Sequence, residues 1–377
     1  MNDRSTWPFG VGLVFTFVGP GCAPQGFDGP TYDTQRLHIE TSFEQPLCVG
    51  DLTEFEDFVD HVEETLSVEL ETPLNIFLRE ELLILDWQGC GRVQGGQLGC
   101  YRHSTHTVYA DFTVIHHELA HAVTASLGRA SPFLEEGIAT AMGTGIVLFN
   151  VSGIEPGSSL RLPPSKLLYA DAAHFTRWLL ETRGAAKWRE LYAKGVASRG
   201  GQKSDFEDVY GITFAELQEE FFEDAPWIYE PSYRFEVPSL QPQEEGFGWY
   251  EEIEFDCSKE DTFGRPDSIS VRRTLEIPAA GVYDFWTSAD AVGIRRALMA
   301  PLTSMEEVER ATFGDAPISI PIAPTGLGAT VTGGQVGALE LDAGRYTVYI
   351  VDFERGGDPA AVLITPHDGT LAVVPEG

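Results

Sequence analysis

The chain has 377 residues, enough for two domains with separate hydrophobic cores, and its 43% hydrophobic content excludes a disordered protein. With 25 Lys and Arg against 58 Asp and Glu, the net charge is −33. Nucleic acid and anionic membrane surfaces would repel such a chain, so neither is expected as a partner, and the acidity fits a protein dissolved outside a cell.

Residues 1–22 have the features of an export leader. Residues 7–19 form an apolar run after Arg4 that is too short to span a membrane and is typical of a signal-peptide core. The run ends in Gly-Pro-Gly-Cys-Ala, which resembles a bacterial lipoprotein signal with Cys22 as the lipidated residue. We therefore expect an exported protein, either secreted or held at the bacterial outer membrane or cell surface by a lipid anchor at Cys22.

The segment after the leader predicts a small mixed sheet. Residues 37–41, 75–78 and 82–85 have the composition of strands, and Asp51 with Glu54 forms a capping-box pattern that opens a helix to about Leu70. Residues 105–110 form a further strand, which we expect to be the edge along which an extended peptide can add.

The next predicted helix carries the pattern H-E-x-x-H at residues 117–121. Asp111 offers an N-cap oxygen before it, and Gly128 is a suitable residue for its end. Because residues four apart share a helix face, His117 and His121 can present two imidazoles to one metal ion, and Glu118 can take a proton from a metal-bound water. The alternative is a pair of buried histidines on an ordinary helix.

A catalytic zinc needs a third protein ligand and an open position. A second helix, with Ser131 as its cap and Pro132 in its first turn, carries Glu135 and Glu136, and one of them should face the first helix. Here the chain resembles the gluzincins, whose second helix carries a W-L-x-E-G-x-A-like segment; residues 133–139 read Phe-Leu-Glu-Glu-Gly-Ile-Ala. The resemblance implies that Glu136 is the third ligand, with Glu135 turned away or assisting from behind. A solvated helix charge is the alternative for Glu136.

The resemblance extends to a helix over residues 167–180, which is similar to the Y-x-x-G-x-x-x-x-x-L helix of gluzincin peptidases. It implies that Tyr169 stabilises the oxyanion of the tetrahedral intermediate. His174 competes for this role because an imidazole can serve the same purpose, and simple packing is the alternative for Tyr169. Thr140 stands where thermolysin-like relatives have an Asp that holds a ligand imidazole.

Residues 232–377 show the alternation and turn signals of an all-β domain. Two segments, 277–285 and 341–348, echo each other as strand, Gly-containing turn and strand. We therefore predict an α+β protein in which a zincin-like domain (residues 23–231, a small mixed sheet plus active-site helices) precedes an all-β sandwich domain (residues 232–377).

The chain has five cysteines, and four remain if Cys22 is lipidated. Four cysteines in an exported chain can form two disulfides, with three possible connectivities. Cys90 and Cys100 flank a Gly-rich turn, which suggests a local bridge, and Cys48 would then pair with Cys257.

The motif and the resemblance together predict a monomeric zinc metallopeptidase acting on a peptide or protein substrate. In this hypothesis His117, His121 and Glu136 hold Zn²⁺ and Glu118 is the general base. Two alternatives are a catalytically silent surface or binding lipoprotein with a structural zinc site, and a zinc hydrolase of a cell-wall amide. The presence of Glu118 favours catalysis, because a purely structural site needs no base.

Overall fold

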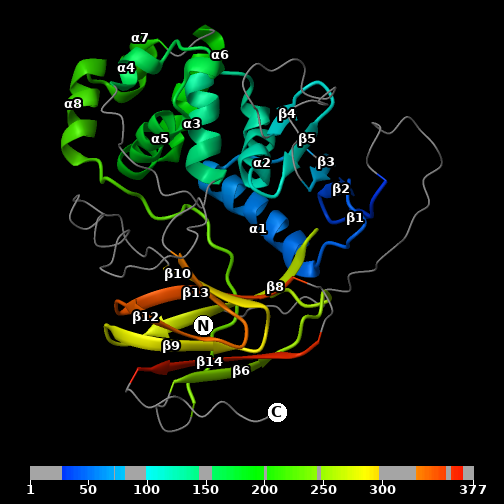
Figure 1. Ribbon diagram of the computed structural model, residues 1–377. Helices are drawn as coiled ribbons and strands as arrows, with labels where there is room; N and C mark the ends of the chain where they lie inside the picture. The colour runs from blue at the N-terminus through cyan, green and yellow to red at the C-terminus, as the bar shows by residue number, and fades with distance from the viewer. Residues whose placement is uncertain are drawn as a thin grey trace, which may run out of the picture.

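The computed structural model describes residues 28–71, 73–80, 99–143, 155–198, 202–243, 248–296, 328–353 and 358–367. Figure 1 shows helices and a small sheet together in the upper part of the molecule and strands alone in the lower part, so the protein is α+β. The predicted leader with Cys22 and the predicted strand over residues 82–85 lie outside the described residues. Within the described ranges, no helix combines the length and the apolar character needed to cross a membrane.

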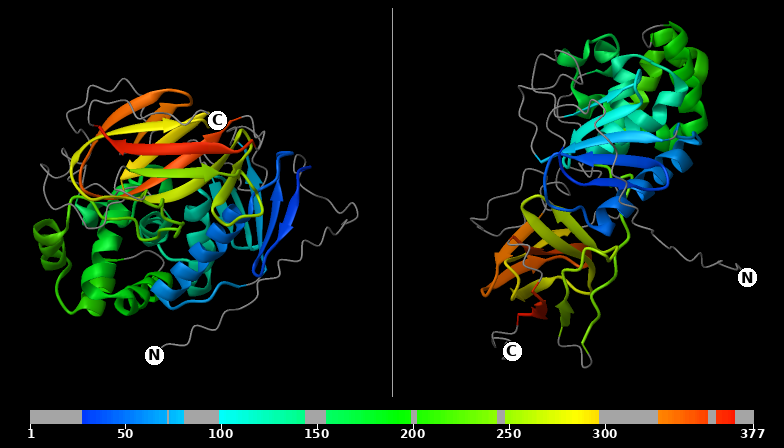
Figure 2. Two further views of the ribbon diagram at one scale, coloured as in Figure 1. Left: turned by 90° about the horizontal axis from the view of Figure 1, so that it is seen from below. Right: turned by 90° about the vertical axis from the view of Figure 1, so that its right-hand side faces the viewer.

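The upper part, which we call the helical part (described residues 28–229), contains a five-stranded sheet of order β1-β2-β3-β5-β4. Its strands are β1 (Thr31–Asp33), β2 (Leu37–Thr41), β3 (Leu74–Arg79), β4 (Gly99–Arg102) and β5 (Thr107–Asp111). The three central strands run parallel, and β1 and β4 pair antiparallel at the two ends. Buried and half-buried residues alternate along β2 and β3, as expected when one face of a sheet covers a core, and Figure 2 shows the helices gathered on one side.

The predicted strands 37–41 and 75–78 are confirmed, and the last predicted strand corresponds to β5. The prediction that this last strand forms the edge was wrong, because β4 pairs with its outer side. β4 follows a Gly-rich stretch, and because its own residues carry no strand pattern it was not predicted.

The first helix, α1 (Val49–Leu66), connects β2 to the parallel strand β3. It begins after Cys48, whose N–H donates to the Asp51 carboxylate at 3.0 Å. The sequence predicted Asp51 as the first capping residue and an end near Leu70, so the predicted helix started about three residues too late and ended about four too late. Asp51 does belong to a capping box, but as the third residue of the helix, with Cys48 as the N-cap.

The remaining helices follow in chain order after β5. They are α2 (Ile115–Thr124), η1 (Ala125–Leu127), α3 (Pro132–Gly143), α4 (Pro156–Ser159), η2 (Pro164–Lys166), α5 (Tyr169–Arg183), α6 (Ala185–Ser198), α7 (Lys203–Tyr210) and α8 (Phe214–Asp224). Gly128 ends the α2–η1 segment with φ 95°, as predicted. One hydrophobic core, between residues 37 and 229, joins these helices to the sheet.

The lower part, which we call the β part (described residues 240–367), consists of two antiparallel sheets. Its strands are β6 (Trp249–Ile253), β7 (Thr262–Arg265), β8 (Ser268–Ile277), β9 (Gly281–Thr287), β10 (Ala291–Arg296), β11 (Gly328–Thr332), β12 (Val336–Leu341), β13 (Gly344–Asp352) and β14 (Ala360–Pro366). The sheets have the orders β11-β10-β13-β8-β7 and β12-β9-β14-β6.

Both echoing segments are confirmed as strand, turn and strand, and each carries the chain from one sheet to the other: β8 to β9 and β12 to β13. The two sheets enclose a second core, to which Leu275 and Val348 contribute from one sheet and Phe285 and Val362 from the other.

A disulfide joins the two parts. Cys48, at the start of α1, is bonded to Cys257, which confirms this pairing, and the N–H of Val49 donates to the carbonyl of Cys257 at 2.8 Å. Cys100 is also disulfide-bonded, and its predicted partner Cys90 lies outside the described residues. The β part is therefore covalently tied to the helix that lies directly below α2 in Figure 1.

Candidate metal centre

The local sequence fixes the direction in which α2 leaves β5. Asp111 Oδ1 accepts the N–H groups of Thr113 and Val114 at 2.7 and 3.2 Å, which closes the turn before the helix. Asp111 was predicted as the N-cap, but that position belongs to Val114, so Asp111 acts one turn earlier. The apolar residues Ile115, Leu119, Ala122 and Val123 of α2 are buried. The face that carries the histidines is therefore directed away from the core.

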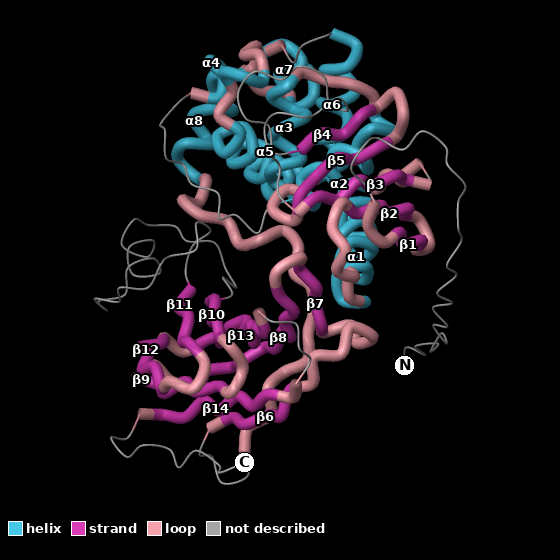
Figure 3. The backbone as a smooth tube through the Cα atoms, turned by 45° about the vertical axis from the view of Figure 1, so that its right-hand side comes forward, coloured by secondary structure: helices cyan, strands magenta, loops and turns pink. Residues whose placement is uncertain are grey.

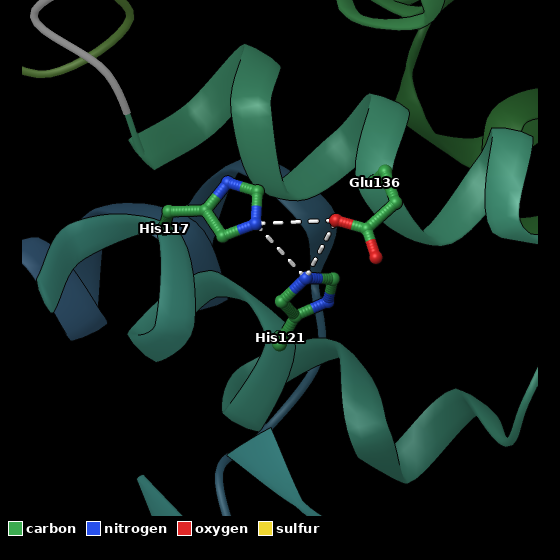
Figure 4. A group of neighbouring side chains, drawn as sticks. All are labelled: His117, His121 and Glu136. Atoms are coloured by element: carbon green, nitrogen blue, oxygen red, sulfur yellow. Dashed lines mark hydrogen bonds and ion pairs between the residues drawn. The ribbon is translucent and has the colours of Figure 1, made fainter. Parts of the chain in front are cut away.

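Three side-chain atoms converge between α2 and α3 (Figure 4). The Nε2 atoms of His117 and His121 are 3.1 Å apart, and they lie 3.2 and 3.3 Å from Oε2 of Glu136. Ligands about 2.0–2.1 Å from a tetrahedral zinc are separated from one another by about 3.3 Å, so the triangle has the dimensions of such a site. Among the residues that the structure describes, this is the one group of His, Cys, Asp or Glu side chains arranged to hold a metal ion.

The electrostatics of Glu136 fit a ligand carboxylate. Burial alone would raise its pKa, but the hydrogen bonds and charges of His117 and His121 hold that pKa well below the usual range for a carboxyl. The side chains of the three residues remain 13–17% exposed, so the group can be reached from solvent. A buried, purely structural site would be closed on all sides.

The neighbouring carboxylate, Glu135, is directed elsewhere. It forms an ion pair with Arg129 at 3.5 Å and is not part of the converging group. The assignment of Glu136, and not Glu135, to the group agrees with what the resemblance implied.

Thr140 lies behind His117. Its Oγ1 is 3.3 Å from His117 Nδ1, and it stands one helical turn after Glu136 on α3. When Nδ1–H donates to Thr140, the Nε2 lone pair of His117 is free to point at a metal ion. Thr140 thus makes this contact from the position where thermolysin-like relatives carry an Asp, an acceptor that the sequence alone did not identify.

Glu118 is buried beside the converging group, with 4% of its surface exposed. Burial raises its pKa to about 8, and the negative charge of Glu136 acts in the same direction. The positive charge of His117 and the N–H of Tyr101 oppose this shift. Its Oε2 has no hydrogen-bond partner among the described residues, which is unusual for a buried carboxylate oxygen and fits a group that acts on a bound molecule.

The strand β4 passes directly over Glu118. A Cβ added to Gly99 would lie 2.7 Å from Glu118 Oε1 and 2.8 Å from its Cγ, so only glycine lets the strand approach this closely. Sequence reasoning missed this contribution. The one available signal was the glycine that ends the Gly-rich turn.

Tyr169, at the start of α5, lies at the group. Its ring is stacked parallel to that of His117, with the centroids 6.1 Å apart. Burial raises the pKa of its hydroxyl, and the nearby carboxylates of Glu136 and Glu118 act in the same direction. The structure therefore brings Tyr169 to the ligands, as the sequence proposed.

His174, the other oxyanion candidate, is held elsewhere. Its ring is 1% exposed, donates from Nε2 to the carbonyl of Pro226 at 2.7 Å, and packs against the rings of Phe221 and Tyr229. Burial lowers its pKa to about 4. None of its described contacts involves the converging group, so the structure gives it a packing role.

The chain matches no protein-family model and no curated protein sequence. Inferences about its chemistry therefore rest on the residues and geometry of this site.

Proposed function

We propose that the protein is a zinc-dependent peptidase of gluzincin type. In this proposal the helical part is a zincin-like catalytic domain and the β part is a β-sandwich accessory domain. The observation that carries it is the convergence of His117 Nε2, His121 Nε2 and Glu136 Oε2 within 3.1–3.3 Å, on two helices packed side by side. Two imidazoles and one carboxylate, still partly open to solvent, are the ligand set of a catalytic zinc site.

Zinc bound by these residues would polarise the scissile carbonyl and lower the pKa of a bound water. Glu118, buried next to His117 and with its pKa raised toward neutrality, suits a residue that takes a proton from water and passes it to the leaving amine. Thr140 would fix the orientation of the His117 ring.

Tyr169 is placed to donate a hydrogen bond to a developing oxyanion. Its hydroxyl lies near the carboxylates of Glu136 and Glu118, and with a raised pKa it is protonated at neutral pH, as a donor must be.

A peptide substrate is supported by the position of β4. Among the residues that the structure describes, this strand stands at the end of the sheet order and pairs on one side with β5, so an extended chain can add along its other side. Because Gly99 in β4 also contacts Glu118, a peptide bound there would run past the proposed base. A substrate without an extended backbone would gain nothing from this arrangement.

Export of the protein is also part of the proposal. A disulfide between Cys48 and Cys257 and a further bond at Cys100 fit an oxidising compartment outside the cytosol. The predicted leader and the anchor at Cys22 belong to the same hypothesis.

The test measures zinc content and cleavage of a diverse peptide library, for the wild type and for Glu118→Gln. We expect both proteins to bind one zinc and only the wild type to cleave. If both bind zinc and neither cleaves, the site is a structural or binding site and the peptidase proposal fails. If neither binds zinc, the metal assignment fails as well.

A further inference from the structure

A hairpin of the β part, β7 and β8, lies against the helix α1. Figure 3 shows β7 reaching from the β part to α1, and the contacts lie at the N-terminal end of that helix, at Gly50 and Asp51. The N–H of Gly264 donates to the Asp51 carboxylate at 2.7 Å. A Cβ added to Gly50 would lie 2.4 Å from the carbonyl oxygen of Thr262, so the helix and the strand are in direct backbone contact.

One arginine of this hairpin forms a buried ion pair with α1. Arg272 Nη1 donates to Glu54 Oε1 at 3.0 Å, and the two side chains are only 14% and 13% exposed. The guanidinium also covers the ring of Phe263, 3.5 Å from its centroid. Burial alone would raise the pKa of Glu54, and the charge of Arg272 is the largest of the effects that reverse this. The pair is therefore a specific, charge-compensated contact between the two parts of the molecule.

The same segment of α1 supports α2, which carries His117 and His121 and which we call the metal helix. Phe55 and Phe58 pack against the ring of His116, with centroids 6.1 and 4.7 Å apart. His116 is half-buried and immediately precedes His117 on α2. Any shift of α1 at Glu54 is thus passed to the residue next to a proposed zinc ligand.

A second arginine reaches the entry to α2. Arg265, at the end of β7, stacks over the ring of Phe112, with its Cζ 4.1 Å from the centroid. Phe112 lies in the short turn between β5 and α2. The hairpin therefore touches the metal helix along two routes, through α1 and at its beginning.

We propose that Arg272 and Arg265 are positioning residues for the metal centre: the β7–β8 hairpin holds α1 and the entry to α2 so that His117 and His121 stay converged. The β part then contributes to zinc binding, because its contacts hold the helices that carry the ligands. This inference rests on the zinc site proposed above. A zinc ion needs all its ligand atoms in place at once, so a loosened α2 binds it less tightly.

The test compares Arg272→Leu with Arg273→Leu in the full-length chain. Arg273 is the neighbouring residue on β8 and its side chain is 10% exposed, but its guanidinium donates to Glu251, Asp261 and the carbonyl of Arg272, all within the β part. Zinc affinity is measured by competition with a chelator, and folding is checked by circular dichroism. Arg272→Met combined with Glu54→Gln removes both charges and leaves neither buried alone, so it serves if the single variant does not fold.

We expect Arg272→Leu, or the double variant, to weaken zinc binding at least tenfold while Arg273→Leu binds like the wild type. Arg272→Lys, which keeps the positive charge, should recover part of the affinity. Equal affinities in the Arg272 and Arg273 variants would overturn the inference, whether both are unchanged or both are reduced. A wild type that binds no zinc would instead refute the metal site itself.

Discussion

Replacement of His174 by Gln should make the protein less sensitive to acid. The wild-type ring donates to Pro226 and is enclosed by Phe221 and Tyr229, and burial lowers its pKa to about 4 from the usual value of 6.5. In the unfolded chain the same imidazole is free to take up a proton near pH 6.5. Between pH 6.5 and 4 the unfolded state therefore binds more protons than the folded state, and stability is lost as the pH falls through this window.

The size of the effect follows from the two pKa values. One pKa unit corresponds to about 1.4 kcal/mol, so an interval of about 2.5 units lowers the free energy of unfolding by about 3 kcal/mol at pH 4 relative to pH 7. Gln keeps an N–H donor near the carbonyl of Pro226 but does not titrate. Contributions from the carboxylates are common to both proteins and cancel in the comparison.

The assay is urea unfolding of the wild type and of His174→Gln at pH 7 and at pH 4, each followed by tryptophan fluorescence and circular dichroism. The wild type should lose about 3 kcal/mol more than the variant between the two pH values. Equal losses in the two proteins would refute the reasoning, because they would mean that His174 titrates alike in the folded and unfolded states.

Three further predictions concern the site. Thr140→Val removes the oxygen that holds His117 Nδ1 and should weaken zinc binding by about 10- to 100-fold, as measured by chelator competition, with Thr140→Ser restoring most of it. Gly99→Ala places a Cβ 2.7 Å from Glu118 Oε1 and should lower kcat while zinc content stays at one per chain, and an unchanged kcat would contradict the contact. Tyr169→Phe should lower kcat by about 10- to 1000-fold with little change in zinc affinity, as expected for an oxyanion donor, and equal turnover would dismiss that role.

The metal helix and its partner could be predicted because the information is local. The spacing of His117 and His121 fixes their common face, and Ser131 with Pro132 marks where the next helix begins. Local signals also have limits. The start of α1 was misplaced because Cys48 is an uncommon capping residue, whereas Asp51 is a common one that here sits inside the helix.

Features that depend on pairing between residues far apart in the chain could not be predicted from the sequence. β4 is a strand because it pairs with β5, and its own residues, Gly99 to Arg102, carry no alternating pattern. The ion pair between Glu54 and Arg272 joins residues 218 positions apart, in a chain with many other charged side chains that could pair. The bond between Cys48 and Cys257 was predictable because so few cysteines leave few pairings.

Tyr169 and His174 illustrate how much helical geometry alone can decide. Both lie on α5, and a separation of five residues turns a side chain by about 140° around the helix axis. Two side chains so placed cannot face one small site from the same helix, so only one of them could be the oxyanion donor. Tyr169 has its ring stacked on that of His117, whereas His174 faces Pro226 on the other side. The resemblance implied Tyr169 as the oxyanion donor, and the helical repeat explains why His174 cannot reach the same site.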